Sequence, residues 1–180
     1  VKRYADNSPP PEPHDVRAHL IGGVPKAEVH AASAAALLNA HGLQPETLFV
    51  ERDADYYDFD PALEQRSHIK DRIEADAGVV AQETAMRQAF DAWWAEHSPQ
   101  VCDLPTRYKA EVDEFDGDMP ANQRNMVVDR QLMAARRDML STFDDALLPV
   151  GLLDSYKLSG VVVSWLFDKQ FDMKTLVAQD

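Results

Sequence analysis

The side chains with the clearest chemical potential in this sequence lie in two acidic clusters. Glu51 to Asp60 holds five acids and three aromatic residues, and Asp113 to Asp118 holds four acids. Alternating aspartates such as Asp53 and Asp55 are typical of calcium loops, but such a loop needs glycine at its sixth position, which here is Asp58. We therefore interpret the first cluster as a solvated acidic turn whose aromatic side chains point inward. A metal ion at the second cluster would need further ligands from other parts of the chain.

Three further candidates for chemistry lack the surroundings that their chemistry requires. Gly22 to Lys26 combines paired glycines with a lysine, but without the Gly-x-x-x-x-Gly-Lys-Ser/Thr spacing of a nucleotide-binding loop. Cys102 has no basic neighbour in the sequence to favour its thiolate, so we expect a buried or inert thiol. The six histidines lack the i, i+4 pairing of a helical zinc site. The sequence therefore predicts no catalytic, cofactor-binding or metal-ligating residues.

The paired glycines begin the first recognisable element. Gly22 and Gly23 permit backbone angles that other residues avoid, and Pro25 has the fixed φ of a first helical turn. We expect a helix from Lys26 to Ala40, ended by Gly42. Its predicted buried face consists of small side chains: Val29, Ala32, Ala36 and Ala40.

Two helices are expected in the middle of the chain, from about Pro61 to Ala77 and from about Gln82 to His97. The second has one apolar arc with Met86, Phe90, Trp93 and His97. Trp94 flanks this arc, and paired tryptophans either pack in a core or stack on a nucleic-acid base; we favour the core. Proline at position 99 is expected to end the helix, and residues 99–120 to be irregular.

A long helix is predicted from Ala121 to Leu147. Its apolar residues form two adjacent stripes, so we expect it to pack on two sides. The first stripe is Val128, Leu132, Ala135, Met139 and Phe143, and the second is Met126, Met133, Leu140 and Leu147. The candidates for contact with DNA or a protein partner are six basic residues of this third of the chain: Arg130, Arg136, Arg137, Lys157, Lys169 and Lys174. For the arginines, the alternative is that their long stems cover apolar surface with the charged heads in water.

One more apolar segment follows this helix. Pro149 and Gly151 end the long helix, and a new element starts at Ser155 or Tyr156 and runs to Phe167. The three consecutive valines from position 161 are β-branched, which fits a buried strand as well as a helix. The sequence leaves both alternatives open.

Composition sets the fold class and the cellular setting. The 180 residues are 45% hydrophobic and 27% charged, which is ordinary for a globular protein. We expect a mainly α, irregular multi-helix domain over 16–180 with long loops and at most a minor β component, preceded by a proline-rich linker or arm over 1–15. One cysteine, no signal-peptide core and no apolar run of about 20 residues predict a cytoplasmic protein without a membrane association.

The net charge of −13 argues against a protein whose main function is to bind DNA. Affinity for DNA comes largely from Lys and Arg on phosphates, and this chain has 18 of them against 31 acids. The imbalance is uneven, because residues 120–180 carry seven basic and eight acidic side chains. If any part of the chain meets nucleic acid, we expect it to be this last third.

Two segments resemble one known family. His19 to Val29 is similar to an "HL-GG-P-AEV" segment, and the residues from Leu152 onward are similar to an "LLD-Y-hydrophobic-W-Asp-Thr-Leu" segment. The matching residues of the second are Leu152, Leu153, Asp154, Trp165, Phe171, Asp172, Thr175 and Leu176. Both segments follow the catalytic domain in the modification (M) subunit of type I restriction-modification systems, the N6-adenine DNA methyltransferases. The chain thus resembles that region over about a third of its length.

The resemblance implies a division of labour. The parent subunit would bind S-adenosylmethionine, methylate adenine at N6 within a bipartite DNA site, and work with a specificity and a restriction subunit. This chain has no glycine-rich cofactor turn, and at Ser8 to Pro11 a proline replaces the aromatic residue of the Asn-Pro-Pro-aromatic loop. We therefore expect a cofactor-free helical fragment of a larger subunit that supports subunit assembly or DNA contacts. The alternative is a freestanding acidic helical module that binds another protein.

Overall fold

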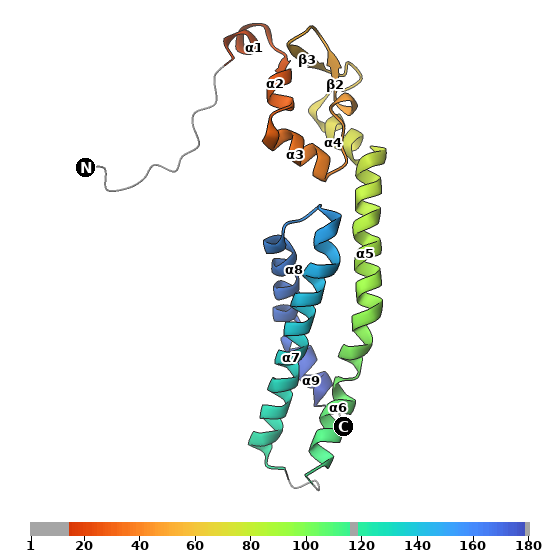
Figure 1. Ribbon diagram of the computed structural model, residues 1–180, viewed down its shortest axis with the longest axis vertical. Coiled ribbons are helices and arrows are strands. Elements are labelled where there is room, and N and C mark those ends of the chain that lie inside the picture. The colour runs from red at the N-terminus through yellow and green to blue at the C-terminus, as the bar shows by residue number, and fades with distance from the viewer. Residues whose placement is uncertain (1–14, 116–118, 179–180) are drawn as a thin grey trace, which may run out of the picture. The chain divides into compact units, whose positions relative to one another are not determined.

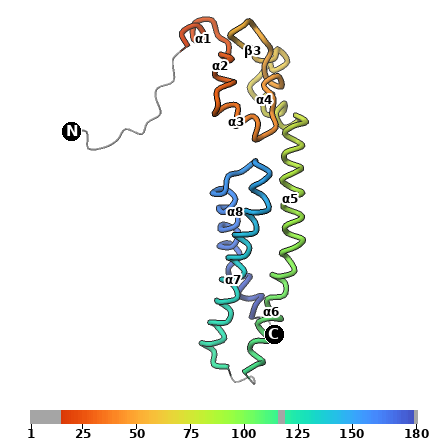
Figure 2. The backbone as a smooth tube through the Cα atoms, in the orientation of Figure 1, coloured from red at the N-terminus to blue at the C-terminus, as the bar shows by residue number. Residues whose placement is uncertain are grey.

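The computed structural model describes residues 15–115 and 119–178. The expected proline-rich segment, apart from Asp15, and the centre of the second acidic cluster lie outside these ranges. The fold is mainly helical, with 74% helix and 6% strand, which confirms the predicted class. The chain divides after Gly78 into two compact units, so the domain expected over 16–180 has two separately packed parts. We call residues up to Gly78 unit 1 and residues from Val79 unit 2, and Figures 1 and 2 show the elements of each.

Unit 1 combines short helices with a small antiparallel sheet. Its elements are α1 (Val16–Ile21), β1 (Val24–Pro25), α2 (Lys26–Val29), α3 (Ala32–Ala40), a 3₁₀ turn (Pro45–Thr47), β2 (Phe49–Glu51), β3 (Tyr56–Phe59) and α4 (Arg66–Glu74). The sheet order is β1-β3-β2, with Val24 opposite Tyr57 and Phe49 opposite Phe59. The turn between β2 and β3 is closed by Asp53, whose carboxylate accepts from the backbone N–H groups of Asp55 and Tyr56. The first acidic cluster therefore supplies β3, the central strand of the minor β component, and the last residue of β2.

The helix predicted from Lys26 to Ala40 is interrupted. Ala31 has extended backbone angles, with φ −57° and ψ 145°, and separates α2 from α3. Of the predicted small-residue face only Val29 is buried, whereas Ala32 and Ala36 are exposed. Alanine side chains remove little apolar area from water, so little hydrophobic free energy favours one continuous helix face here.

Unit 2 is a set of helices around one apolar core. Its elements are α5 (Ala77–Cys102, beginning two residues before the unit), α6 (Leu104–Asp113), α7 (Ala121–Leu147), a 3₁₀ turn (Leu148–Val150), α8 (Ser155–Asp168) and α9 (Gln170–Val177). Helix α7 runs alongside α8 and also contacts α6 and α9. The buried core is Trp93, Leu104, Val128, Leu132, Met139, Phe143, Leu147, Leu158, Val162, Leu166, Met173 and Val177. The first predicted stripe of the long helix supplies much of this core.

Both helices predicted in the middle of the chain have other bounds, and the first of them ends at Glu74 rather than Ala77. Helix α4 starts at Arg66 rather than Pro61, because the Asp60 carboxylate accepts from the Ala62 N–H and closes a turn there. Helix α5 begins at Ala77 and continues past Pro99 to Cys102. Proline removes one backbone hydrogen bond, and because Pro99 lies three residues before the end of α5, the rest of the helix keeps its own hydrogen bonds. The segment predicted to be irregular after Pro99 contains α6.

The two C-terminal predictions had different outcomes. Helix α7 has the predicted bounds, but Met126 and Met133 of its second stripe are exposed, so that stripe is not fully packed. The segment from Ser155 is a helix rather than a strand. Its start is fixed by the Asp154 carboxylate, which accepts from the Lys157 N–H at 2.9 Å.

Candidate functional site

The HL-GG-P-AEV segment forms α1, the glycine turn, β1 and α2, and its contacts are internal to unit 1. Gly22 and Gly23 have φ of 77° and 102°. The Arg52 guanidinium fills the turn, donating to the Gly22 carbonyl at 2.6 Å and to the Asp58 carboxylate. A side chain on Gly23 would place its Cβ 2.6 Å from Arg52 Nη1, closer than any real contact. Gly23 is therefore needed for the close approach of Arg52, whereas a Cβ on Gly22 would meet open space.

Lys26, the lysine of the same segment, interacts with side chains of unit 1 itself. Lys26 Nζ lies 2.6 Å from a Glu51 carboxylate oxygen and 5.0 Å from the centre of the Tyr57 ring. The hydrogen bond between Lys26 and Glu51 raises the pKa of the lysine and lowers that of Glu51. The helix after the turn, α2, has only four residues. This lysine holds α2 on the sheet, in agreement with the structural turn that the sequence favours.

A second cluster attaches α1 to the β2–β3 hairpin. The Asp15 carboxylate caps α1 by accepting from the N–H groups of Arg17 and Ala18, and it accepts from the Tyr56 hydroxyl at 2.6 Å. The hydrogen bond from Tyr56 is the largest cause of a lowered pKa at Asp15. Arg17 lies over the Tyr56 ring and pairs with Asp53 at 2.9 Å. The acidic cluster therefore builds structure, and among the described residues no group of three or more His, Cys, Asp or Glu side chains could hold a metal.

Four of the six basic candidates have acidic partners. Lys157 pairs with Asp154 at 3.4 Å and Lys169 with Asp172 at 3.2 Å, each within its own helix turn. Lys174 reaches from α9 to Asp129 of α7 at 2.9 Å. Arg130, which follows Asp129, pairs with Glu111 of α6, and this hydrogen bond is the main reason why the pKa of Glu111 is lowered. These cations are locally neutralised, which weakens their attraction for phosphate.

The other two basic candidates lie on α7 as neighbours in sequence but differ in environment. Arg136 is partly buried, and its Nε has no hydrogen-bond partner among the described residues. Arg137 is exposed, and no ion pair joins it to any residue that the structure describes. Arg136 is thus partly covered by its own unit, whereas Arg137 lies at the surface, and contact of either arginine with DNA or a protein partner stays a prediction.

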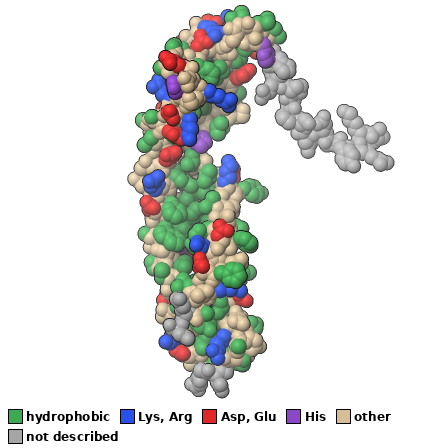
Figure 3. Space-filling model, turned by 180° about the vertical axis from the view of Figure 1, so that it is seen from behind, with side chains coloured by type: hydrophobic (Ala, Val, Ile, Leu, Met, Phe, Trp, Pro, Cys, Tyr) green, Lys and Arg blue, Asp and Glu red, His purple; other side chains and the backbone are tan. Residues whose placement is uncertain are grey.

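Helix α8 has a buried apolar face and a second, exposed apolar face. Leu158, Val162 and Leu166 are buried in the core of unit 2. Tyr156, Val163 and Phe167, spaced at i, i+7 and i+11, share the exposed face, with Tyr156 92% accessible. We call these three residues, with Phe171 of α9, the outer stripe. Hydrophobic side chains form continuous areas on the surface that α5 to α9 make (Figure 3).

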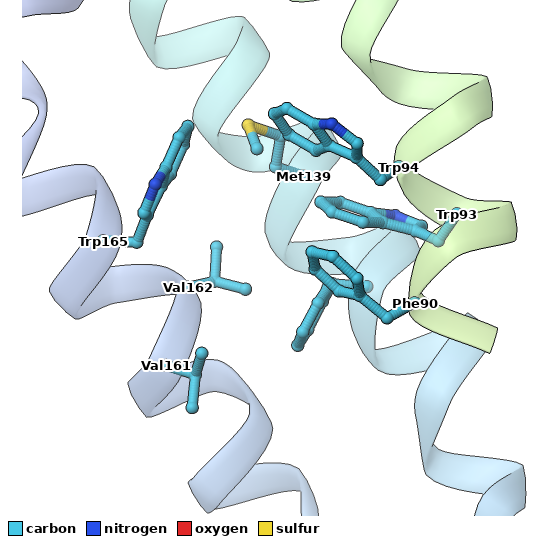
Figure 4. Close-up of a pocket in the computed structure, with 8 residues that line it drawn as sticks. Phe90, Trp93, Trp94, Met139, Val161, Val162 and Trp165 are labelled. Atoms are coloured by element: carbon cyan, nitrogen blue, oxygen red, sulfur yellow. The ribbon is translucent and has the colours of Figure 1, made fainter. Parts of the chain in front are cut away.

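An aromatic cavity lies in unit 2 between α5, α7 and α8. It has a volume of about 290 Å³ and is lined by Phe90, Trp93, Trp94, Met139, Phe143, Val161, Val162 and Trp165. The first three come from α5, the next two from α7 and the last three from α8 (Figure 4). Sequence periodicity grouped Phe90 with Trp93 but could not place α8 opposite them. The Cys102 thiol, expected to be buried or inert, is exposed at the end of α5, and its inertness stays a prediction.

Comparison of the chain with family models, with curated proteins and with solved structures found no match in any of the three. Within the part of the chain that the structure describes, no helix is both long and apolar enough to cross a bilayer.

Proposed function

We propose that this chain is a non-catalytic helical region of a type I restriction-modification M subunit and that it serves subunit assembly. The observation that carries the proposal is the outer stripe. It lies on the segment that resembles the family's second motif, and its exposed aromatic side chains are the kind that protein interfaces bury. In this proposal the parent subunit supplies S-adenosylmethionine binding and adenine-N6 methylation, and the specificity subunit, the restriction subunit and DNA are its partners.

Between the two supporting roles, protein contact is favoured over DNA contact. The net charge is −13, and four of the six basic candidates already pair with carboxylates. Neutralised cations release few counterions from DNA, so they contribute little affinity. Burial of an exposed apolar stripe under another protein, by contrast, lowers the free energy of the system and favours association.

The first test is the coding sequence on either side of this segment. An upstream glycine-rich turn and an Asn-Pro-Pro-aromatic motif would support the proposal. A reading frame limited to these residues would contradict it and favour the freestanding acidic interaction module, for which the same outer stripe would be the binding surface. We also expect calorimetry on the isolated chain to detect no binding of S-adenosylmethionine, and tight binding would overturn the proposed division of labour.

The second test concerns assembly. In the full-length subunit, the double substitution Tyr156→Asp and Phe167→Asp places two charges on the outer stripe, and we expect at least about a tenfold loss of co-purification with the proposed specificity subunit. Ser164→Asp is the matched control, because it adds a charge at an exposed position of the same helix outside the stripe. Equal retention of the partner by both variants would remove the outer stripe from the assembly role.

A further inference from the structure

The aromatic cavity of unit 2 has the properties of a ligand site that the proposed function does not use. Its volume of about 290 Å³ lies just below the range of roughly 300–1,000 Å³ for small-molecule pockets, which limits an occupant to a small molecule. Figure 4 shows Trp93, Trp94 and Phe90 on one side and Val161, Val162 and Trp165 on the other, with Met139 at the back. Side chains from three helices therefore line the space, which is partly open to solvent, and all of them belong to unit 2.

The lining excludes charged and strongly polar occupants. All eight lining side chains are uncharged and largely apolar. The indole N–H of Trp93 already donates to the Thr142 hydroxyl at 3.0 Å, so it does not require a polar ligand. An ionised ligand would lose its hydration without gaining a counter-charge from the lining, and an anion would also meet the field of a chain with a net charge of −13.

The ring geometry suits a planar aromatic occupant. Trp93 meets Phe143 edge to face at 4.8 Å between centroids and 80°, and Trp94 meets Trp165 at 6.1 Å and 81°. Both Trp94 and Trp165 are exposed at the cavity. A flat ring that enters can extend this edge-to-face arrangement and remove the exposed indole area from water.

We propose that this cavity binds an uncharged planar aromatic compound of one or two rings. The inference concerns the cavity alone and stands independently of the assembly role. The uncharged lining identifies the chemical class of the occupant, because it favours an uncharged ring over the ionised derivatives of the same ring.

The test uses one ring in three charge states: indole, tryptamine and indole-3-acetate, titrated into the full chain. Binding is measured by calorimetry and by methyl NMR signals of Met139, Val161 and Val162. We expect indole to bind with a dissociation constant on the order of 10⁻⁴ to 10⁻³ M, and each charged relative to bind at least about tenfold more weakly. The methyl shifts are expected to be largest at these three lining residues.

A cavity-filling variant locates the site. Val161→Phe places a ring in the cavity from a position that is 56% exposed, so the fold is expected to tolerate it. We expect it to weaken indole binding at least about tenfold. Val163→Phe is the matched control, since Val163 is 53% exposed on the same helix and does not line the cavity; its affinity should stay within about twofold of the wild type. If Val161→Phe lost its helical circular dichroism, Val161→Met would replace it.

Three results would overturn the proposal. The first is no detectable binding of indole at 5 mM, about five times the weakest expected dissociation constant. The second is binding that Val161→Phe and Val163→Phe weaken equally, because the ring would then sit elsewhere. The third is tryptamine binding more tightly than indole, which would make the cluster a site for organic cations on aromatic faces.

Discussion

Gly23 lies where the chain has no room for a side chain. Its φ of 102° is strained for any other residue, and a Cβ would approach Arg52 Nη1 to 2.6 Å and the Tyr57 carbonyl to 3.3 Å. We expect Gly23→Ala to destabilise unit 1 by about 1–3 kcal/mol. Gly160→Ala is the control, because a Cβ there meets open space within α8; it should be neutral or stabilising by up to about 1 kcal/mol. Urea unfolding followed by NMR of Tyr56 and Trp165 separates the two units, and equal effects of the two substitutions would contradict the strain assigned to a side chain at position 23.

The Asp15 carboxylate links pH to the stability of unit 1. Its pKa in the folded chain is below the ordinary value of 3.8, first because Tyr56 donates a hydrogen bond to it and second because the Ala18 N–H does. A lowered folded pKa means that the stabilisation is present above about pH 4 and is lost as the pH falls through the folded pKa. We expect Tyr56→Phe to raise the pKa of Asp15 toward 3.8, measured by carboxyl ¹³C NMR.

Tyr57→Phe is the matched control for this pKa measurement. The Tyr57 hydroxyl lies 3.1 Å from His30 Nε2 and has no contact with Asp15. Its removal should leave the Asp15 titration unchanged. A pKa shift of equal size in both variants would mean that a general loosening of the hairpin, and not the lost hydrogen bond, controls the carboxylate.

At the scale of elements, α7 is the helix around which unit 2 packs, and its buried face supplies the side chains that stabilise the core. Leu132 is 2% exposed in the core, whereas its neighbour Met133 is 60% exposed. Truncation of a buried leucine removes apolar contacts and leaves a cavity, so we expect Leu132→Ala to lower the free energy of unfolding by about 2–5 kcal/mol. Met133→Ala should change it by at most about 0.5 kcal/mol. Urea unfolding monitored by tryptophan fluorescence measures both, and similar values would contradict the assignment of the core face.

At the scale of the whole molecule, the two units differ in what holds them together. Unit 1 relies on hydrogen bonds and ion pairs around a three-stranded sheet, whereas the large apolar cluster lies entirely in unit 2. All three tryptophans, Trp93, Trp94 and Trp165, are also in unit 2. Tryptophan fluorescence therefore reports on unit 2 alone.

We expect a fragment of residues 77–180, which keeps α5 whole, to fold without unit 1. Its tryptophan emission maximum should equal that of the full chain, and it should unfold cooperatively in urea. A red-shifted emission, or a non-cooperative loss of helical circular dichroism, would show that unit 2 needs unit 1 to complete its core.

The sequence by itself determined the elements whose signals are local. Helix α7 follows from apolar residues repeating at helical spacing between Pro120 and Pro149, and the glycine turn follows from Gly22 and Gly23, which alone adopt positive φ without strain there. The mainly α class was also predictable, and of the aromatic residues expected to point inward Tyr56 and Tyr57 do so, whereas Phe59, at the end of β3, is 48% exposed. Each of these depends on residues close together in the chain.

The tertiary structure decided what depends on distant partners. The helical state of Val161 to Val163 was open in the sequence because β-branched residues fit a strand or a helix, and packing of α8 on α7 resolves it. The basic candidates could be selected from sequence, but their neutralisation, such as that of Lys174 by Asp129, requires α9 to reach α7. The aromatic cavity exists only because α8 places Trp165 opposite Trp94 of α5, 71 positions earlier, a pairing that no local periodicity encodes.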